Sequence, residues 1–224
     1  RVLLSALTIA LGVALYVSVD VSHSSAGAAF RKSSERLSGG AQLQVTRGRM
    51  IGIEATALET VERIPGVKAA PVLQISTTVP GAGSLLLLGV DFSRESAVRG
   101  WSSSGPAKFN PLAFMFGAAI VVTERYASQH ALKLGGSFGI DTPDGVRAVT
   151  VGAIVKDEGA ALVFGGAVAA MPVGTAQRLF RREGRLDRID LAVSGDVAAV
   201  AEQLRKALGP GFEVQPPPRQ NSLL

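Results

Sequence analysis

The sequence predicts an α+β fold: an N-terminal transmembrane and stalk helix, then a ferredoxin-like pair of βαβ units split by an inserted mostly-β subdomain. Three observations support this fold class. A long charge-free run opens the chain, two distant segments share a strand–helix–turn–strand order, and strand patterns dominate the sequence between them. The predicted division is 1–38 for the span and stalk, 39–80 with 187–217 for the split unit, 81–186 for the insertion, and 218–224 for a linker toward a second span.

The N-terminal stretch from Val2 to Val19 is predicted to cross a membrane. It contains no charged residue, and Arg1 and Asp20 flank it. As a helix it would extend about 27 Å, close to the hydrocarbon core of about 30 Å in a bilayer. Two alternatives stay open, namely an export signal cleaved within the small-residue segment 24–30 and a buried core helix.

Small residues recur at every fourth position of this predicted span, at Ala6, Ala10, Ala14 and Ser18. Such a ridge lets membrane helices approach closely, so we expect it to pack against further spans. A chance row in an Ala-rich helix is the alternative. The segment 21–38 has no proline and can continue the helix as a stalk, although its Ser and Gly residues weaken it.

Composition narrows the classes of protein and of site. The chain has 224 residues, 47% of them hydrophobic, and carries 23 Lys and Arg against 18 Asp and Glu. The basic residues are dispersed, which favours solubility and some affinity for a membrane surface over binding of nucleic acid. Cysteine is absent, so disulfides and cysteine metal sites are excluded.

The first βαβ unit is predicted from three consecutive patterns. The segment 41–46 alternates like a strand, and 65–79 is a Pro-Gly turn followed by an extended run. Between them, 53–64 is predicted to be a helix with one apolar face, formed by Ala57, Leu58, Val61 and Ile64.

The second unit repeats this order near the C-terminal end of the sequence. A strand is predicted at 187–193, an amphipathic helix at 196–208 with Asp196 as its N-cap, and a turn and strand at 209–218. Both units place a Pro-Gly turn after the helix, at Pro65 and Pro210, with another proline six residues later. The shared order predicts that the two units pack together.

The sequence between the two units is predicted to be mostly β. Strands are expected at 83–90, at 118–123, at 165–173, and in a hairpin at 137–155 whose turn is Thr-Pro-Asp-Gly. Two short helices are expected, one at 123–134 with Thr123 as N-cap and one at 174–184 that ends at Gly184.

Several short motifs occur in a fixed order along the chain: "RIPGV" (63–67), "LGVDF" (88–92), "AIVVTERYASQHALKLGGSF" (119–138), "VTVGAIV" (149–155), "AMPVGTAQRLFRREGRLDRIDLAV" (170–193) and "VAAVAEQLRKAL" (197–208). The ordered set resembles the FtsX-like ABC transporter permeases that carry a MacB-type extracytoplasmic core domain. One departure is Gly136-Ser137, where that family commonly has Gly-Asp.

The resemblance implies a permease subunit of a bacterial ABC transporter, of which this chain holds the first span and the large domain outside the cytoplasmic membrane. It implies three partners: a cytoplasmic ATP-binding subunit, a second permease subunit in a homo- or heterodimer, and the lipid bilayer. It also implies mechanical coupling of ATP hydrolysis to export or extraction of a peptide, lipoprotein or antibiotic-like substrate, with no enzymatic activity and no cofactor. The alternative is a single-span, membrane-tethered binding or sensor module without an ATPase partner.

One motif suggests nucleophilic catalysis, because "GGSFG" (135–139) matches the nucleophile elbow of α/β-hydrolases around Ser137. That elbow needs a strand before it and a helix after it, whereas the predicted order here is the reverse. A hydrolase of this type also places its His after the Ser, but His23 and His130 both precede Ser137. We therefore expect a Gly-rich turn.

Charged and apolar clusters supply the remaining candidate sites. Asp141, Asp144, Asp157 and Glu158 match no calcium loop and are expected to be solvated turn carboxylates. The apolar, Gly-rich segment 158–168 either is buried under the hairpin or touches a partner. Arginines cluster near the end of the predicted helix 174–184, where they form either a solvated helix end or a contact with a partner or anionic lipid: Arg178, Arg181, Arg182, Arg185 and, further on, Arg188.

Overall fold

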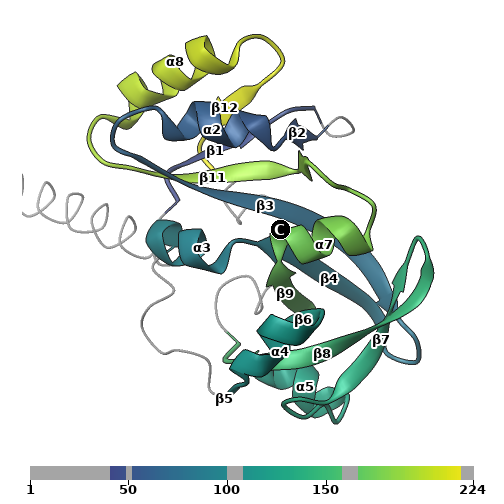
Figure 1. The fold of residues 1–224 in the computed structure, drawn as a ribbon. Coiled ribbons are helices and arrows are strands. Elements are labelled where there is room, and N and C mark those ends of the chain that lie inside the picture. Colours follow the sequence, from purple (N-terminus) through teal and green to yellow (C-terminus); the bar gives the residue numbers. More distant parts are fainter. Residues whose placement is uncertain (1–40, 49–51, 100–107, 158–165, 218–224) are drawn as a thin grey trace, which may run out of the picture. The chain divides into compact units, whose positions relative to one another are not determined.

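A computed structural model describes residues 41–48, 52–99, 108–157 and 166–217, all within the unit Ser38–Leu224 (Figure 1). The predicted span, its small-residue ridge and the stalk lie outside the described residues. Within the described ranges, no helix is both long and apolar enough to cross a membrane.

The described chain forms twelve strands and six helices. The strands are β1 (Leu43–Thr46), β2 (Ile53–Glu54), β3 (Val67–Val79), β4 (Gly83–Val90), β5 (Lys108–Phe109), β6 (Ala119–Thr123), β7 (Ser137–Thr142), β8 (Gly145–Val155), β9 (Val168–Pro172), β10 (Arg185–Leu186), β11 (Arg188–Val193) and β12 (Glu213–Gln215). The helices are α2 (Thr56–Glu62), α3 (Phe92–Arg99), α4 (Pro111–Phe116), α5 (Glu124–Gln129), α7 (Val173–Leu179) and α8 (Val197–Leu208).

Ten of these strands form one sheet in the order β12-β1-β11-β3-β4-β9-β6-β8-β5, with β7 paired to β8 beside this path. The first four run antiparallel to their neighbours, so the two predicted strand–helix–strand units interleave: β1 and β3 from one unit flank β11 from the other. The predicted order of elements in these units is confirmed, except that the first two residues of the predicted helix 53–64 form the strand β2. The short strands β2 and β10 pair with each other outside this sheet.

The helices α2 and α8 cover one face of this part of the sheet (Figure 1). The apolar face of α8 holds Val200, Ala201 and Leu204, which are buried together with residues of β1, β11 and α2. The predicted N-cap is confirmed, because the carboxylate of Asp196 accepts hydrogen bonds from the backbone N–H groups of Ala198 at 2.9 Å and Ala199 at 3.3 Å.

The 13-residue strand β3 belongs to both parts of the sheet. Its first half pairs with β11 from Val67 to Val72, and its second half pairs with β4 from Val72 to Val79. One hydrophobic cluster lies around α2 and α8, and another surrounds Leu73, Ile120 and Met171. The sheet is thus continuous across the predicted boundary near residue 80, while the division into split unit and insertion stays a prediction.

The second part of the sheet mixes strand directions. β9 runs parallel to β4 and antiparallel to β6, β6 runs parallel to β8, and β7–β8 is the predicted antiparallel hairpin. The predicted N-cap of α5 is confirmed, since the hydroxyl of Thr123 accepts from the N–H of Tyr126 at 3.1 Å.

Two predicted helix ends are wrong for the same reason. α5 ends at Gln129 and not at 134, and α7 ends at Leu179 and not at 184. Each stops at a left-handed residue other than glycine, Ala131 (φ 51) or Arg181 (φ 53). The next N–H then reaches five residues back, from Leu132 to the carbonyl of Ala127 and from Arg182 to that of Gln177, both at 2.8 Å. This backbone pattern closes a helix without a glycine signal.

The sequence analysis did not predict α3 and α4. The helix α3 lies on the face of β3 opposite α2, because Val98 packs with Ala70 whereas the adjacent strand residue Ala69 belongs to the cluster of α2 and α8. Asp91 begins this helix, since its carboxylate accepts from the backbone N–H groups of Ser93 and Arg94.

Candidate functional site

The structure separates the arginines that are clustered in the sequence. Arg178 lies on α7, Arg181 and Arg182 in the following turn, Arg185 on β10 and Arg188 on β11. Four of the five pair with carboxylates of this chain: Arg181 with Asp144, Arg182 with Asp187 at 2.8 Å, Arg185 with Glu54 at 3.8 Å, and Arg188 with Asp190 at 3.2 Å. These pairs tie the segment after α7 to the hairpin, to β2 and to the sheet.

Arg178 is the exception in this cluster. Its side chain is exposed, and its Nη2 group donates to the hydroxyl of Thr175 at 3.3 Å, one turn earlier on α7. It borders a cavity of about 330 Å³, whose lining comes from α7, the hairpin β7–β8 and the turn before β6: Gly117, Ala118, Asp144, Arg147, Thr175, Arg178 and Leu179.

Arg147 was not among the sequence-predicted residues, although it lines the same cavity as Arg178. It lies near the start of β8, and its side chain is exposed. No carboxylate of the described ranges lies within ion-pair distance of Arg147 or Arg178. The fold therefore places at one cavity two guanidinium groups that have no carboxylate partner among the described residues, 31 positions apart in the sequence (178 − 147).

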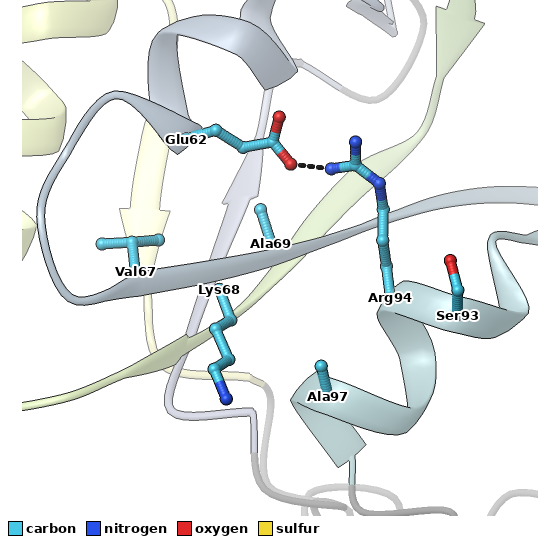
Figure 2. Close-up of a pocket in the computed structure, with 7 residues that line it drawn as sticks. All are labelled: Glu62, Val67, Lys68, Ala69, Ser93, Arg94 and Ala97. Carbon is cyan, nitrogen blue, oxygen red and sulfur yellow. Dashed lines mark ion pairs between the residues drawn. The ribbon is translucent and has the colours of Figure 1, made fainter.

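A second cavity, of about 440 Å³, lies between α2, the start of β3 and α3 (Figure 2). Arg94 of α3 extends across the edge of β3 and pairs with Glu62 at the end of α2. Its Nε atom also lies 3.1 Å from the Oδ2 atom of Asp91. The other lining residues are Val67, Lys68, Ala69, Ser93 and Ala97.

The part of β3 behind this ion pair has an open edge. The backbone N–H of Ser194 donates to the carbonyl of Gly66 at 2.8 Å, so every second residue of β3 from Gly66 onward turns its backbone hydrogen-bonding groups toward β11. The residues between them, such as Ala69, turn their backbone groups toward the opposite edge of β3. β4 begins its pairing with β3 only at Val72, and no described strand pairs with this edge of β3, opposite β11, before that point. A charged pair across an open edge blocks pairing with other chains, so we interpret this cavity as edge protection.

The residues considered for catalysis do not converge. Ser137 is exposed at the start of β7, and its Oγ lies 3.1 Å from the hydroxyl of Thr150 on the neighbouring strand. The ring of His130 packs on that of Tyr126, with the centroids 4.4 Å apart. A helix precedes Ser137 and a strand follows it, as the sequence predicts for a Gly-rich turn.

Two of the four carboxylates considered for a cation have other partners, and Asp141 is exposed on β7. Asp144 pairs with Arg181, and Asp157 accepts from the backbone N–H of Arg125 at 3.2 Å. In the described part of the chain, no group of three or more His, Cys, Asp or Glu side chains could hold a metal ion. His23, Glu158 and the segment 158–165 lie outside the described residues.

Tyr126 is a buried group that the sequence analysis did not single out. Its side chain is 1% exposed beneath α5, and its hydroxyl has no hydrogen-bond partner among the described residues. Burial raises the pKa of this hydroxyl above its ordinary value of 10.0. Tyr126 lines neither of the two cavities described above, so we assign its side chain to the hydrophobic core.

Comparisons with known proteins agree with the fold. The model of the family described as MacB-like periplasmic core domain matches residues 2–207. An ABC transporter permease protein of Mycobacterium tuberculosis is 27% identical over 217 residues, which are 94% of this chain and 25% of that protein. The chain thus spans about a quarter of the length of this relative.

Two solved structures share the fold. The periplasmic region of MacB from Actinobacillus actinomycetemcomitans matches with a TM-score of 0.56 and 15% identity, covering 80% of this chain and 89% of that one. The extracellular domain of the transporter YknZ from Gram-positive bacteria matches with a TM-score of 0.58 and 13% identity, covering 78% and 99%.

Proposed function

The chain belongs to the family of MacB-like periplasmic core domains, and from this premise we propose that it is the first span and the extracytoplasmic domain of an ABC transporter permease. The observation that carries the proposal is the extent of the family match, which begins inside the predicted span and ends in α8. The permease relative, which matches over 94% of this chain, supports the same assignment.

We place the protein in a bacterial cytoplasmic membrane, with the described domain outside. A cytoplasmic ATP-binding subunit and a second permease subunit are its proposed partners. The proposed work is mechanical: ATP-driven movement inside displaces the span, and the stalk 21–38 transmits the displacement to the outer domain. The proposed substrate is a peptide, lipoprotein or antibiotic-like molecule that is exported or extracted. We also propose that the interleaved βαβ units are the ferredoxin-like part of this domain.

An insertion in the stalk tests this mechanism. Gly-Gly-Gly placed after Ala29 of the full permease should leave ATP hydrolysis by the complex largely intact and abolish the output outside the membrane, because glycine weakens a helix by about 1 kcal/mol per residue. The matched control places the same insertion after Pro210, in an exposed turn between α8 and β12, and should preserve both activities.

Normal output from the Ala29 insertion would refute mechanical transmission through the stalk. Failure of the full-length protein to co-purify with any ATP-binding subunit would favour a membrane-tethered sensor module. The variant Ser137→Ala should retain both ATP hydrolysis and output, and loss of output would favour an enzymatic role.

A further inference from the structure

We propose that the cavity between α7 and the hairpin β7–β8 binds a carboxylate from an acidic segment of a protein partner. Arg147 and Arg178 supply the positive charge, and Thr175 supplies a hydroxyl. The inference does not require that the chain transmits force.

The charge balance of the cavity favours an anion. Its lining includes two arginines without a carboxylate partner in the described ranges, whereas its one acid, Asp144, is paired with Arg181. Because the pair of Asp144 with Arg181 is neutral as a whole, the two arginines leave the lining with a net positive charge. A guanidinium presents several N–H donors in a planar fork that matches the two oxygens of a carboxylate, so two guanidinium groups at one cavity can both donate to one bound carboxylate.

The wall of this cavity already accommodates a carboxylate beside a guanidinium, in the pair of Asp144 and Arg181, and the choice of a carboxylate rests on that pair. Net positive charge attracts a carboxylate and a phosphate alike, so competition by phosphate is one outcome of the test below. The cavity thus has the chemistry that an acidic side chain needs.

The uncharged part of the lining leaves room for the stem of such a side chain. The volume of about 330 Å³ lies at the lower end of the range for ligand pockets. Gly117 has extended backbone (φ −166), and a Cβ added there would meet only the carbonyl of Ala113, at 3.9 Å. A side chain at Gly117 would therefore narrow the cavity without straining the backbone.

Binding of an acidic peptide tests the proposal. The full chain in nanodiscs of zwitterionic lipid is titrated, at fixed ionic strength, into fluorescein-labelled acetyl-Ala-Glu-Glu-Ala-amide, and anisotropy reports binding. Arg147→Gln and Arg178→Gln should each weaken binding at least threefold, and Gly117→Leu should weaken it with no change of charge. Arg63→Gln removes the same charge from the exposed end of α2 and should change the dissociation constant less than twofold.

Three results would overturn the proposal. Equal weakening by Arg63→Gln and Arg178→Gln would mean that net charge alone attracts the peptide. Inorganic phosphate that displaces the peptide better than acetate does would identify a phosphate site. Loss of binding to phosphatidylglycerol vesicles in the arginine variants, with unchanged peptide binding, would identify a lipid contact. An unchanged thermal midpoint in each variant shows that its fold is intact.

Discussion

The substitution Leu204→Asp tests how the C-terminal helix packs. Leu204 is fully buried on α8, in the cluster that also contains Val45, Leu191 and Val214. Truncating a buried leucine to alanine costs about 2–5 kcal/mol, and a carboxylate without a partner in the same place adds several kcal/mol of desolvation. The expected loss of about 5 kcal/mol or more is comparable to the whole stability of a domain, which is about 5–15 kcal/mol.

Thermal unfolding of the full chain in nanodiscs, followed by circular dichroism, measures this loss. A domain of this size shifts its midpoint by about 2–4 °C per kcal/mol, so Leu204→Asp should lower it by about 10–20 °C or abolish the transition. The matched control Gln203→Asp introduces the same carboxylate at the neighbouring exposed position of α8 and should shift the midpoint by about 2 °C or less. If Leu204→Asp unfolds at the wild-type temperature, α8 does not face the core and the split unit is wrong.

Three further variants test local features. Asp196→Ala removes the cap of α8 and should cost about 1 kcal/mol in urea unfolding, whereas an unchanged midpoint would show that the capping bonds contribute nothing. Gly89→Ala places a Cβ 2.7 Å from that of Ala176 and should destabilise by about 1–3 kcal/mol; full stability would mean that α7 can move away from β4. Tyr126→Phe should match or exceed wild-type stability at pH 8, because the buried hydroxyl has no hydrogen-bond partner among the described residues. Since burial raises the pKa of Tyr126 in the folded state, the unfolded chain loses its proton first as pH rises above about 10, and wild-type stability should fall there relative to Tyr126→Phe; parallel pH profiles would contradict this.

The parts of the fold that depend on local sequence were predicted well. A continuous apolar run after a turn indicated β4, and the Thr-Pro-Asp-Gly turn between two strand patterns indicated the hairpin β7–β8. The side chains of Thr123 and Asp196 marked the first turns of α5 and α8. An N-cap acts on backbone groups two or three residues away, so its signal is contained in the sequence of one turn. The apolar face of α8 was predicted for a similar reason, because it repeats with the helical period.

The helix ends and α3 depend on signals that the sequence carries weakly. Arg181 adopts the left-handed conformation that glycine usually occupies at the end of a helix, whereas the prediction took the glycine signal at Gly184 as the end of α7. The helix α3, "FSRESAVR", is mostly polar, and Val98 is buried through its contact with Ala70 of β3. Val98 is buried only when β3 lies beside the helix, and the eight residues of α3 show no apolar face of their own, so their pattern could not predict the helix.

The arginine cluster shows why nearness in the sequence is a poor guide to a shared surface. Arg181 pairs with Asp144 across 37 positions, and Arg185 pairs with Glu54 across the β2–β10 pairing. These carboxylate partners could not be predicted before the topology was known. Their negative charges balance four of the five arginines, so the cluster offers a ligand much less net positive charge than the sequence suggests. Arg178 has no carboxylate partner among the described residues, and it lines the same cavity as Arg147.

The continuity of the sheet bears on the proposed mechanical role. β3 extends for about 40 Å at about 3.3 Å per residue, and its two halves serve the two hydrophobic clusters. A hinge near residue 80 would have to break the backbone hydrogen bonds between β3 and β4, which pair over eight residues. The pair Arg181–Asp144 adds a second connection, from the end of α7 to the turn of the hairpin. Under the proposed mechanism, a displacement of β1 would be passed to β7 and β8 through one hydrogen-bonded sheet, as expected of a stiff body and not of a flexible insertion.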